Sequence, residues 1–217
     1  GAHTFEIIRR FGSGVKIIGL DFDSDAIDRA KALVGELPHD TVFRTIGFQD
    51  MDKVLDELNL IHVDRILLDL GLSSFQLEIA GRDFSFMTAE PLLMTMRKDP
   101  AEEALTARDI VNTWEEKTLA DIIYGFGEEK YSRKIAKAIV EARKEKDIET
   151  TFDLVKIIDS AVGRSYRGLK IHPSTRTFQA LRIATNSELT NLERVIEKGF
   201  GRLAIGGRMA IITFHSL

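Results

Sequence analysis

The sequence contains no cysteine, and among its 217 residues it has only four prolines and one tryptophan. Without cysteine, disulfides, thiolate zinc sites and mechanisms with a cysteine nucleophile are excluded, and a reducing compartment such as the cytoplasm becomes the default expectation. No apolar run approaches the roughly 20 residues of a membrane span, the start lacks the regions of a signal peptide, and no histidine spacing indicates a metal site. The remainder, with 44% hydrophobic and 29% charged residues, is typical of a globular chain.

The charge of the chain is unevenly distributed. Residues 130–182 hold thirteen Lys and Arg against six Asp and Glu, a balance of +7, so the rest of a chain with net charge −4 carries −11. A basic segment in an acidic protein can be a footprint for phosphate groups. It can equally be the solvated face of helices, and charge alone leaves both interpretations open.

Short apolar segments alternate with amphipathic ones in the first half of the sequence, which predicts a parallel, doubly wound α/β sheet. The third strand is so apolar that we expect it inside the sheet rather than at an edge. The strands are predicted at residues 15–20, 41–46 and 63–68, and the helices at residues 25–33, with Ser24 as the cap and Leu33 on the inner face, and at about 50–60.

The middle of the chain shows helical periodicity without a strand pattern, and the α/β pattern resumes towards a last strand at residues 208–214. We therefore predict a first part of the core (residues 1–104), an inserted helical domain (105–171) and a second part of the core (172–217). A doubly wound sheet normally opens with a strand and a glycine-rich turn, and neither precedes the first predicted helix, residues 4–10. The expectation is a segment of a longer protein, with the first strand and the C-terminal strands missing. Further helices are predicted at residues 114–124, 131–146, 151–162, 174–186 and 187–203.

Ligands of such sheets bind at the carboxyl ends of the strands, so the residues just past each strand form a candidate site. Asp21 can accept hydrogen bonds from both hydroxyls of a ribose, Gly47 permits a close approach, and Phe48 can cover a purine ring. Asp69 follows the third strand, and the helix start at residues 1–3 offers backbone N–H groups. Together they favour a ribonucleoside cofactor, although Asp21 or Asp23 can simply be a helix cap and Phe48 a core residue. The pattern does not separate a nicotinamide dinucleotide from S-adenosylmethionine.

A second candidate site is the string of residues 170–182. Pro173, followed by two hydroxyl residues, predicts a helix start. This start places Arg176, Gln179 and Arg182 near the N-terminal end of a helix, with groups that suit phosphates and base edges. A capped helix with solvated arginines explains the same string. Three histidines would add to the site only if they meet at the strand ends: His3, His172 and His215.

Strings in a fixed order carry a resemblance that spans essentially the whole chain. The most specific are residues 172–183 (HPSTRTFQALRI) and 214–217 (FHSL). With these strings, the sequence resembles the bacterial small-subunit ribosomal RNA (cytosine-N4) methyltransferases, the RsmH/MraW family. The remaining strings are residues 19–27, 67–74, 82–86, 127–130 and 206–213.

The resemblance implies a Rossmann-like class I methyltransferase sheet with an inserted helical domain. It implies S-adenosylmethionine as the methyl donor and a cytidine in the decoding region of 16S rRNA as the acceptor, met within the small ribosomal subunit. In line with the apolar runs and the histidine spacing, we expect no membrane partner and no metal, and a homodimer is an alternative to a monomer. The cofactor positions that the resemblance implies are Gly1, Ala2, His3, Asp21, Phe48, Asp69 and Gln76, where Ala2 replaces a usual glycine. Our candidates for catalysis are Asp69, Ser73 and His215, and our candidates for RNA binding are Arg133, Lys134, Lys137, His172, Arg176 and Gln179.

The chemistry agrees with an exocyclic amine as the acceptor. Methylation of C5 of cytosine needs a cysteine that adds to the ring, and this sequence has none. Transfer to N4 relies on alignment of the reacting atoms and on acceptors for the hydrogens of the amine, for which Asp69 lies at the right strand end. The target base must also leave its stack to reach the donor.

Two departures from the family pattern fall in the loops near the active site. Leu93 and Thr95 stand where the usual Pro-Leu-Asp-Met-Arg-Met has an acid and a base, and Asp83 replaces the glycine of Arg-Gly-Phe-Ser. These changes keep a second hypothesis open, in which the chain is a non-catalytic RNA-binding or ribosome-assembly module that retains the fold. A nicotinamide oxidoreductase is a weaker alternative.

Overall fold

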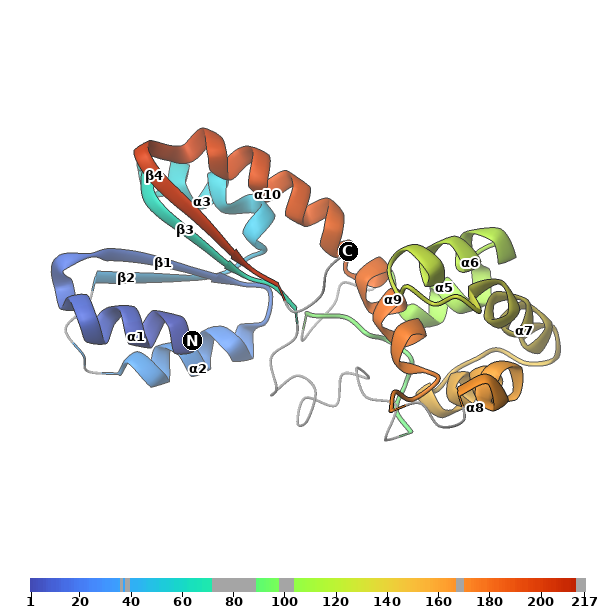
Figure 1. The fold of residues 1–217 in the computed structure, drawn as a ribbon. Helices are drawn as coiled ribbons and strands as arrows, with labels where there is room; N and C mark the ends of the chain where they lie inside the picture. The colour runs from blue at the N-terminus through green and yellow to red at the C-terminus, as the bar shows by residue number, and fades with distance from the viewer. Residues whose placement is uncertain (36, 38–39, 72–88, 98–103, 167–169, 214–217) are drawn as a thin grey trace. The chain divides into compact units, whose positions relative to one another are not determined.

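The computed structural model describes the chain except for residues 36, 38–39, 72–88, 98–103, 167–169 and 214–217. The described elements form two compact units (Figure 1). The first unit comprises Gly1–Leu70, Met96–Asp99 and Leu189–Thr213, and the second, called the helical unit below, comprises Gly71–Thr95, Pro100–Glu188 and Phe214–Leu217.

The first unit contains two pairs of parallel strands. β1 (Lys16–Asp21) pairs with β2 (Asp40–Thr45) along its whole length. β3 (Val63–Asp69) pairs with β4 (Leu203–Ile212). Parallel strands joined through helices confirm the predicted Rossmann-like α/β class, but the described strands form two two-stranded sheets rather than one.

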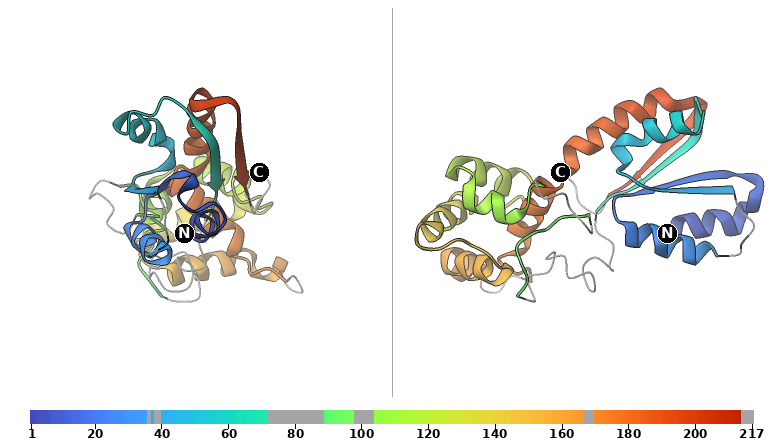
Figure 2. Two further views of the ribbon diagram at one scale, coloured as in Figure 1. Left: turned by 90° about the vertical axis from the view of Figure 1, so that its left-hand side faces the viewer. Right: turned by 180° about the vertical axis from the view of Figure 1, so that it is seen from behind.

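Helices cover one face of each strand pair. α1 (Ala2–Phe11) and α2 (Ser24–Val34) lie along β1 and β2, while α3 (Met51–Glu57) and α10 (Glu188–Arg202) lie along β3 and β4 (Figures 1 and 2). Short 3-10 turns at Gly12–Gly14 and Phe48–Asp50 link these elements. Both strand pairs share one core, in which Ile18 and Leu20 of β1 pack against the buried cluster of Met51, Leu55, Ile66, Leu68 and Val195.

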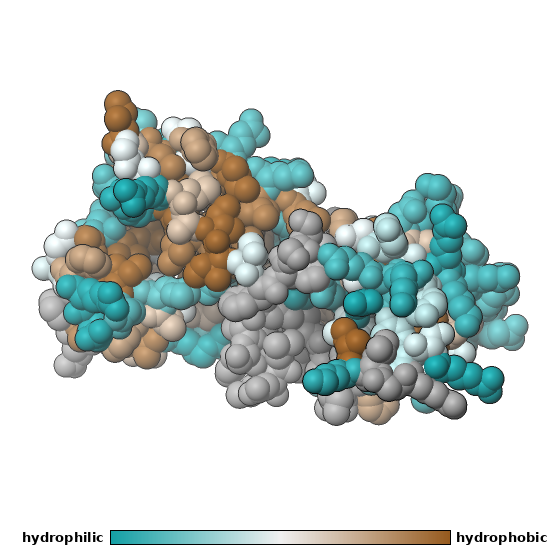
Figure 3. All heavy atoms as spheres, in the orientation of Figure 1, coloured by the Kyte–Doolittle hydropathy of each residue, from teal (hydrophilic) through white to brown (hydrophobic). Residues whose placement is uncertain are grey.

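The opposite face of β3 and β4 is not covered by a helix of the described residues. Hydrophobic side chains gather there at the surface (Figure 3), and Leu67 and Ile211 are 43% and 38% exposed. β3 pairs only with β4 in the described part of the chain, so the predicted interior position of this strand is wrong for this structure. Its alternation of buried and exposed residues is that of a strand with one covered face.

Two predicted details of α2 are wrong. The cap is Asp23, whose carboxylate accepts from the N–H of Asp25 at 2.9 Å, and Ser24 is the first helical residue. Leu33 is 48% exposed, because the helix buries Val34 instead.

The start of β4 also differs from the prediction. The strand begins at Leu203 rather than at Arg208 and runs through Gly206, which has φ 79°, and Gly207. The pairing register with β3 is irregular over the same stretch. Glycine inside a strand typically marks such an irregularity. The predicted end of the strand near Phe214 lies outside the described residues.

The helical unit confirms the predicted run of helices between residues 114 and 186. Fully buried isoleucines and leucines, such as Ile123 and Leu154, form its core, and capping boxes at Thr106 and Thr150 begin two of its helices. α9 belongs to this compact unit, although the sequence assigns it to the core, so the predicted domain limits stay a prediction. The helices are α5 (Ala107–Thr113), α6 (Glu116–Gly125), α7 (Ser132–Glu145), α8 (Thr151–Val162) and α9 (Thr175–Thr185), with a 3-10 turn at Gly163–Tyr166.

Candidate functional site

The carboxyl end of β1 presents Asp21. Its Oδ1 accepts from the N–H of Asp23 at 2.9 Å, and because the fully buried Asp23 caps α2, Asp21 is not needed as a helix cap. The pKa of the Asp21 carboxyl is raised, chiefly because the surrounding protein desolvates it, and the nearby Asp23 carboxylate adds to this shift. Asp21 is nevertheless exposed at the strand end, so a ligand can reach it, and the hydroxyls of a ribose are hydrogen-bond donors that would stabilise a carboxylate beside a second acid.

The carboxyl end of β2 requires a glycine. A Cβ on Gly47 would lie 2.1 Å from the Phe22 ring, so no other residue fits while that ring keeps its place. The guanidinium of Arg97 lies over the same ring, 4.9 Å from its centre. Phe48 is half-buried and packs against the core cluster, so the core interpretation of Phe48 has direct support, and a purine-covering role stays a prediction.

The carboxyl end of β3 meets the start of α1. His3 Nε2 lies 3.1 Å from Asp69 Oδ2, and both side chains are about half exposed. α1 has no acidic residue in its first turn and no side-chain hydrogen bond at its N-cap, Gly1. Its first backbone N–H groups therefore suit an anionic group of a ligand. The structure thus brings His3 and Asp69 together. Among the described residues, His3 is the one of the three candidate histidines that lies at a strand end.

These features fit S-adenosylmethionine. The carboxylate of Asp21 suits ribose hydroxyls, and the start of α1 suits a carboxylate. The close approach at Gly47 is made by the protein's own Phe22 ring. Three further candidates fall outside the described residues: Ser73, Gln76 and His215. No group of three or more metal-ligating side chains lies within the described ranges, and no helix there is long and apolar enough to cross a membrane.

The candidates for RNA binding on α7 are exposed. Arg133, Lys134 and Lys137 lie in the first turns of the helix, and within the described part of the chain none of them makes an ion pair within 4 Å. Like charges three and four residues apart repel one another, and cations at a helix N-terminus are disfavoured by the helix dipole. The cations are thus held where the helix alone would not favour them, which supports binding to an anionic partner.

The string around α9 is divided between structural and exposed groups. Arg176 lies in the first turn of α9 and is half-buried, and Gln179 donates to the carbonyl of Phe126 at 3.2 Å. His172 is exposed, and its Nδ1 accepts from the N–H of Ser174 at 3.2 Å. The predicted position of Arg176 near the start of the helix is thus confirmed. The sequence does not show that the amide of Gln179 already makes a hydrogen bond within the protein.

The position predicted for Arg182 is wrong. It lies in the last turn of α9 and binds Glu188 through two nitrogens, at 2.7 and 3.1 Å. Burial raises the pKa of the Glu188 carboxyl, and the facing Arg182 opposes that shift. Arg182 is therefore held in an internal ion pair.

The departures from the family pattern fit their surroundings. Leu93 is half-buried and Thr95 is 8% exposed, and between them Met94, at φ 57°, is 1% exposed. The carbonyl of Leu93 accepts from the N–H of Ala107 at 2.9 Å, which ties the segment to α5. An acid at residue 93 would face partial burial here, so leucine suits this version of the loop.

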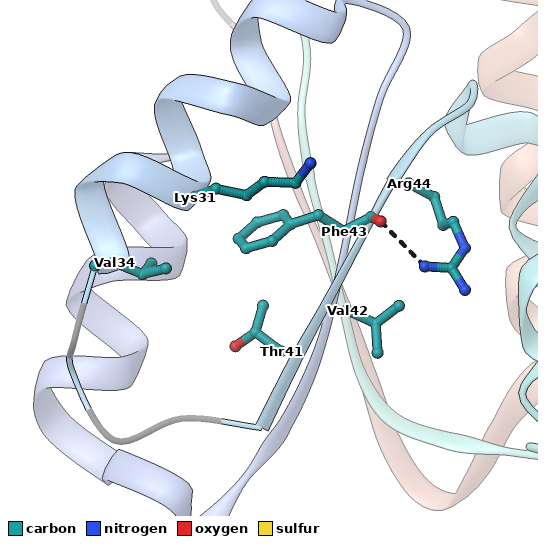
Figure 4. Close-up of a pocket in the computed structure, with 7 residues that line it drawn as sticks. Lys31, Val34, Thr41, Val42, Phe43 and Arg44 are labelled. Atoms are coloured by element: carbon teal, nitrogen blue, oxygen red, sulfur yellow. Dashed lines mark hydrogen bonds between the residues drawn. The ribbon is translucent and has the colours of Figure 1, made fainter.

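A shallow pocket lies beside β2 (Figure 4). The Nζ of Lys31 lies 3.4 Å from Asp28, and Arg44 donates to Glu57 at 2.7 Å and to the carbonyl of Phe43 at 3.2 Å. Both cations are therefore already engaged, and the pocket lies along the strand rather than beyond its carboxyl end. We assign no function to it.

Comparison with known proteins places these features in context. The whole chain, residues 1–217, matches the model of the MraW methylase family. A protein of Clostridium botulinum (strain Kyoto / Type A2) named ribosomal RNA small subunit methyltransferase H is 44% identical over all of this chain and 69% of its own length. Proteins of the same name are 45% identical in Lachnospira eligens, over 99% of this chain and 67% of that protein, and 42% identical in Dictyoglomus thermophilum, over 100% and 71%.

Proposed function

The chain belongs to the MraW methylase family, and we propose that it transfers a methyl group from S-adenosylmethionine to N4 of a cytidine in small-subunit ribosomal RNA. The observation that carries this proposal is that Asp21 ends β1 and that the His3–Asp69 pair lies at the end of β3, both at the carboxyl ends of parallel strands. Nothing in the described residues or in the names of the relatives favours the non-catalytic alternative. The test is methyl incorporation into unmethylated small subunits, followed by identification of the methylated base.

The acceptor chemistry defines what the residues of this chain must do. The N4 lone pair is delocalised into the ring, so the amine becomes a nucleophile only when its geometry is held and its hydrogens have acceptors. As the nitrogen gains a methyl group it loses a proton, and Asp69 is the carboxylate at the right strand end to accept it or to fix the donor. The donor supplies an activated methyl group on a sulfonium, so no covalent catalyst is needed.

The partner that we propose is 16S rRNA in its decoding region, met within the small ribosomal subunit. Exposed cations of the helical unit support this assignment, because phosphate contacts supply much of the affinity for RNA. Sedimentation of the purified protein tests the homodimer that the resemblance allows, and a purely monomeric protein would exclude it.

Asp21→Ala should weaken binding of S-adenosylmethionine by about ten- to a hundred-fold, because a lost pair of charge-assisted hydrogen bonds costs roughly 1.5–3 kcal/mol. Calorimetry on the intact protein measures the affinity. Asp28→Ala is the matched control, since Asp28 is an exposed acid on α2 whose carboxylate lies 3.4 Å from the Nζ of Lys31. Equal affinities in the wild type and in Asp21→Ala would remove Asp21 from the cofactor site.

Charge reversal of Arg133, Lys134 and Lys137 should weaken binding to small subunits and leave the affinity for S-adenosylmethionine unchanged. The wild-type affinity should fall as salt rises, and the triple variant should show a smaller salt slope, because each lost phosphate contact removes about one unit from it. Lys117→Glu with Lys144→Glu is the matched control, as both lysines pair with acids of their own helices at 3.0 and 2.9 Å. Identical salt slopes in the wild type and the triple variant would show that these cations are merely solvated.

A further inference from the structure

The loop between α6 and α7 carries a buried carboxylate for which the sequence predicts no role. Glu129 is 0% exposed. Its Oε1 accepts from the N–H of Tyr131 at 2.8 Å, and its Oε2 accepts from the hydroxyl of Tyr166, which follows α8. The carboxylate thus joins the loop to a segment 37 residues away.

A contribution to the stability of the fold does not by itself explain a buried Glu129. Among the described residues it makes no ion pair within 4 Å, and its hydrogen-bond donors are a neutral hydroxyl and a backbone amide. Burial of a carboxylate without a paired cation is costly, and apolar residues of similar size often stabilise a core better. A role in fixing positions accounts for such a group better than a contribution to stability.

A cation of α9 acts electrostatically on this pair. Burial raises the pKa of Tyr166 to about 12, with Glu129 as the next cause, so the tyrosine remains a donor at neutral pH. The positive charge of Arg176, in the first turn of α9, acts in the opposite direction on that pKa. The hydrogen bond thus joins Glu129 to Tyr166, and the guanidinium of Arg176 acts on this pair through its charge.

The loop is fitted closely against α9. A Cβ on Gly127 would lie 2.4 Å from the carbonyl oxygen of Arg176, and Gln179 binds the carbonyl of Phe126 at 3.2 Å. Directly after Glu129 in the sequence, the Nζ of Lys130 lies over the Tyr131 ring, 5.3 Å from its centre. The loop that Glu129 anchors thus packs on the start of α9 and leads directly into the cations that begin at Lys130 and continue on α7.

We propose that Glu129 is a positioning residue for RNA binding: its bond to Tyr166 fixes the loop before α7 against the start of α9, so that Arg176 and the cations after the loop form one cationic surface. The inference rests on the proposed function, since it requires that the helical unit binds the RNA. It differs from a structural role in one respect: removal of the carboxylate should impair RNA binding through Arg176 and not merely through loss of stability.

The test compares Glu129→Gln, Tyr166→Phe, Arg176→Ala and the double variant Glu129→Gln/Arg176→Ala in the intact protein. The readouts are KM for unmethylated small subunits, kcat, and the melting temperature. Arg176→Ala should raise KM about tenfold, the scale of one lost charge-assisted contact. Glu129→Gln and Tyr166→Phe should raise KM and leave kcat nearly unchanged, and the double variant should be no worse than Arg176→Ala alone.

Asn112→Ala is the matched control for stability. The Asn112 side chain makes two partly buried hydrogen bonds of 2.9 Å to the backbone of Ile148 in the same unit. Its loss should therefore lower the melting temperature without changing KM. If Glu129→Gln and Tyr166→Phe behave like this control while Arg176→Ala raises KM, the positioning role is overturned. If Arg176→Ala also leaves KM unchanged, Arg176 is not an RNA contact, and charge reversal on α7 then shows separately whether the helical unit binds RNA at all. Should Glu129→Gln fail to fold, Tyr166→Phe, which removes one hydroxyl, decides the question by the same criteria.

Discussion

Asp69→Asn should lower the single-turnover rate of methylation at low S-adenosylmethionine by about 10²-fold, the scale of a lost positioned proton acceptor or of a lost charged contact to the donor. Asparagine keeps the shape of the side chain but loses the charge that faces His3 at 3.1 Å. Because His3 lies in the first turn of α1, the pair joins the end of β3 to the backbone N–H groups that suit the donor. We therefore expect most of the loss to disappear when the donor is saturating.

The rate at saturating donor separates the two roles of Asp69. A rate that recovers assigns Asp69 to donor binding, whereas a rate that stays low assigns it to the N4 proton. Asp64→Asn is the control, since Asp64 is an exposed acid on the same strand. A wild-type rate in Asp69→Asn at both low and saturating donor would exclude Asp69 from the site.

The strand ends could be predicted because a parallel sheet places them by rule. Each of the first three strands was found within one residue of its predicted limits, and the polar or glycine residue beyond it follows directly from where the apolar run stops. Asp69 and His3 are 66 residues apart, and the sequence could state only what their meeting would mean.

Local chemistry misled the prediction where two similar residues compete. Asp23 and Ser24 are both good caps, and the choice depends on Asp21, whose carboxylate holds the N–H of Asp23. In the same way, Arg182 has the charge to bind a phosphate, and only the fold shows that Glu188 occupies it. Such outcomes depend on partners that the periodicity of a helix does not reveal.

The Glu129–Tyr166 contact was beyond the reach of sequence reasoning for a different reason. The string of residues 127–130 attracts attention only through the resemblance, and a glutamate in a short loop between helices normally indicates solvent exposure. Its burial arises because the loop, the turn after α8 and the start of α9 pack together, a tertiary arrangement that no single segment encodes. The only local signal is Gly127, a glycine where a turn between helices would tolerate most residues.

We expect Gly127→Ala to destabilise the helical unit by about 1–3 kcal/mol, the usual cost of overpacking. The added Cβ would lie 2.4 Å from the carbonyl oxygen of Arg176 and 2.8 Å from that of Ile123. Both are backbone atoms, so a rotation of a side chain cannot relieve the clash. Gly125→Ala is the matched control, because a Cβ on Gly125 has no atom within 4 Å, and alanine at the end of α6 should be neutral or stabilising.

Denaturant or thermal unfolding of the two variants measures the difference, and at this chain length each 1 kcal/mol corresponds to about 2–4 °C in melting temperature. Opposite signs for two glycine-to-alanine changes two residues apart would show that the close fit of the loop on α9, rather than chain flexibility, determines the effect. Equal small effects would mean that the loop can move away from α9. In that case the carbonyl of Arg176 would not be held against Gly127, and the proposed cationic surface would lose one of the contacts that fix the loop on α9.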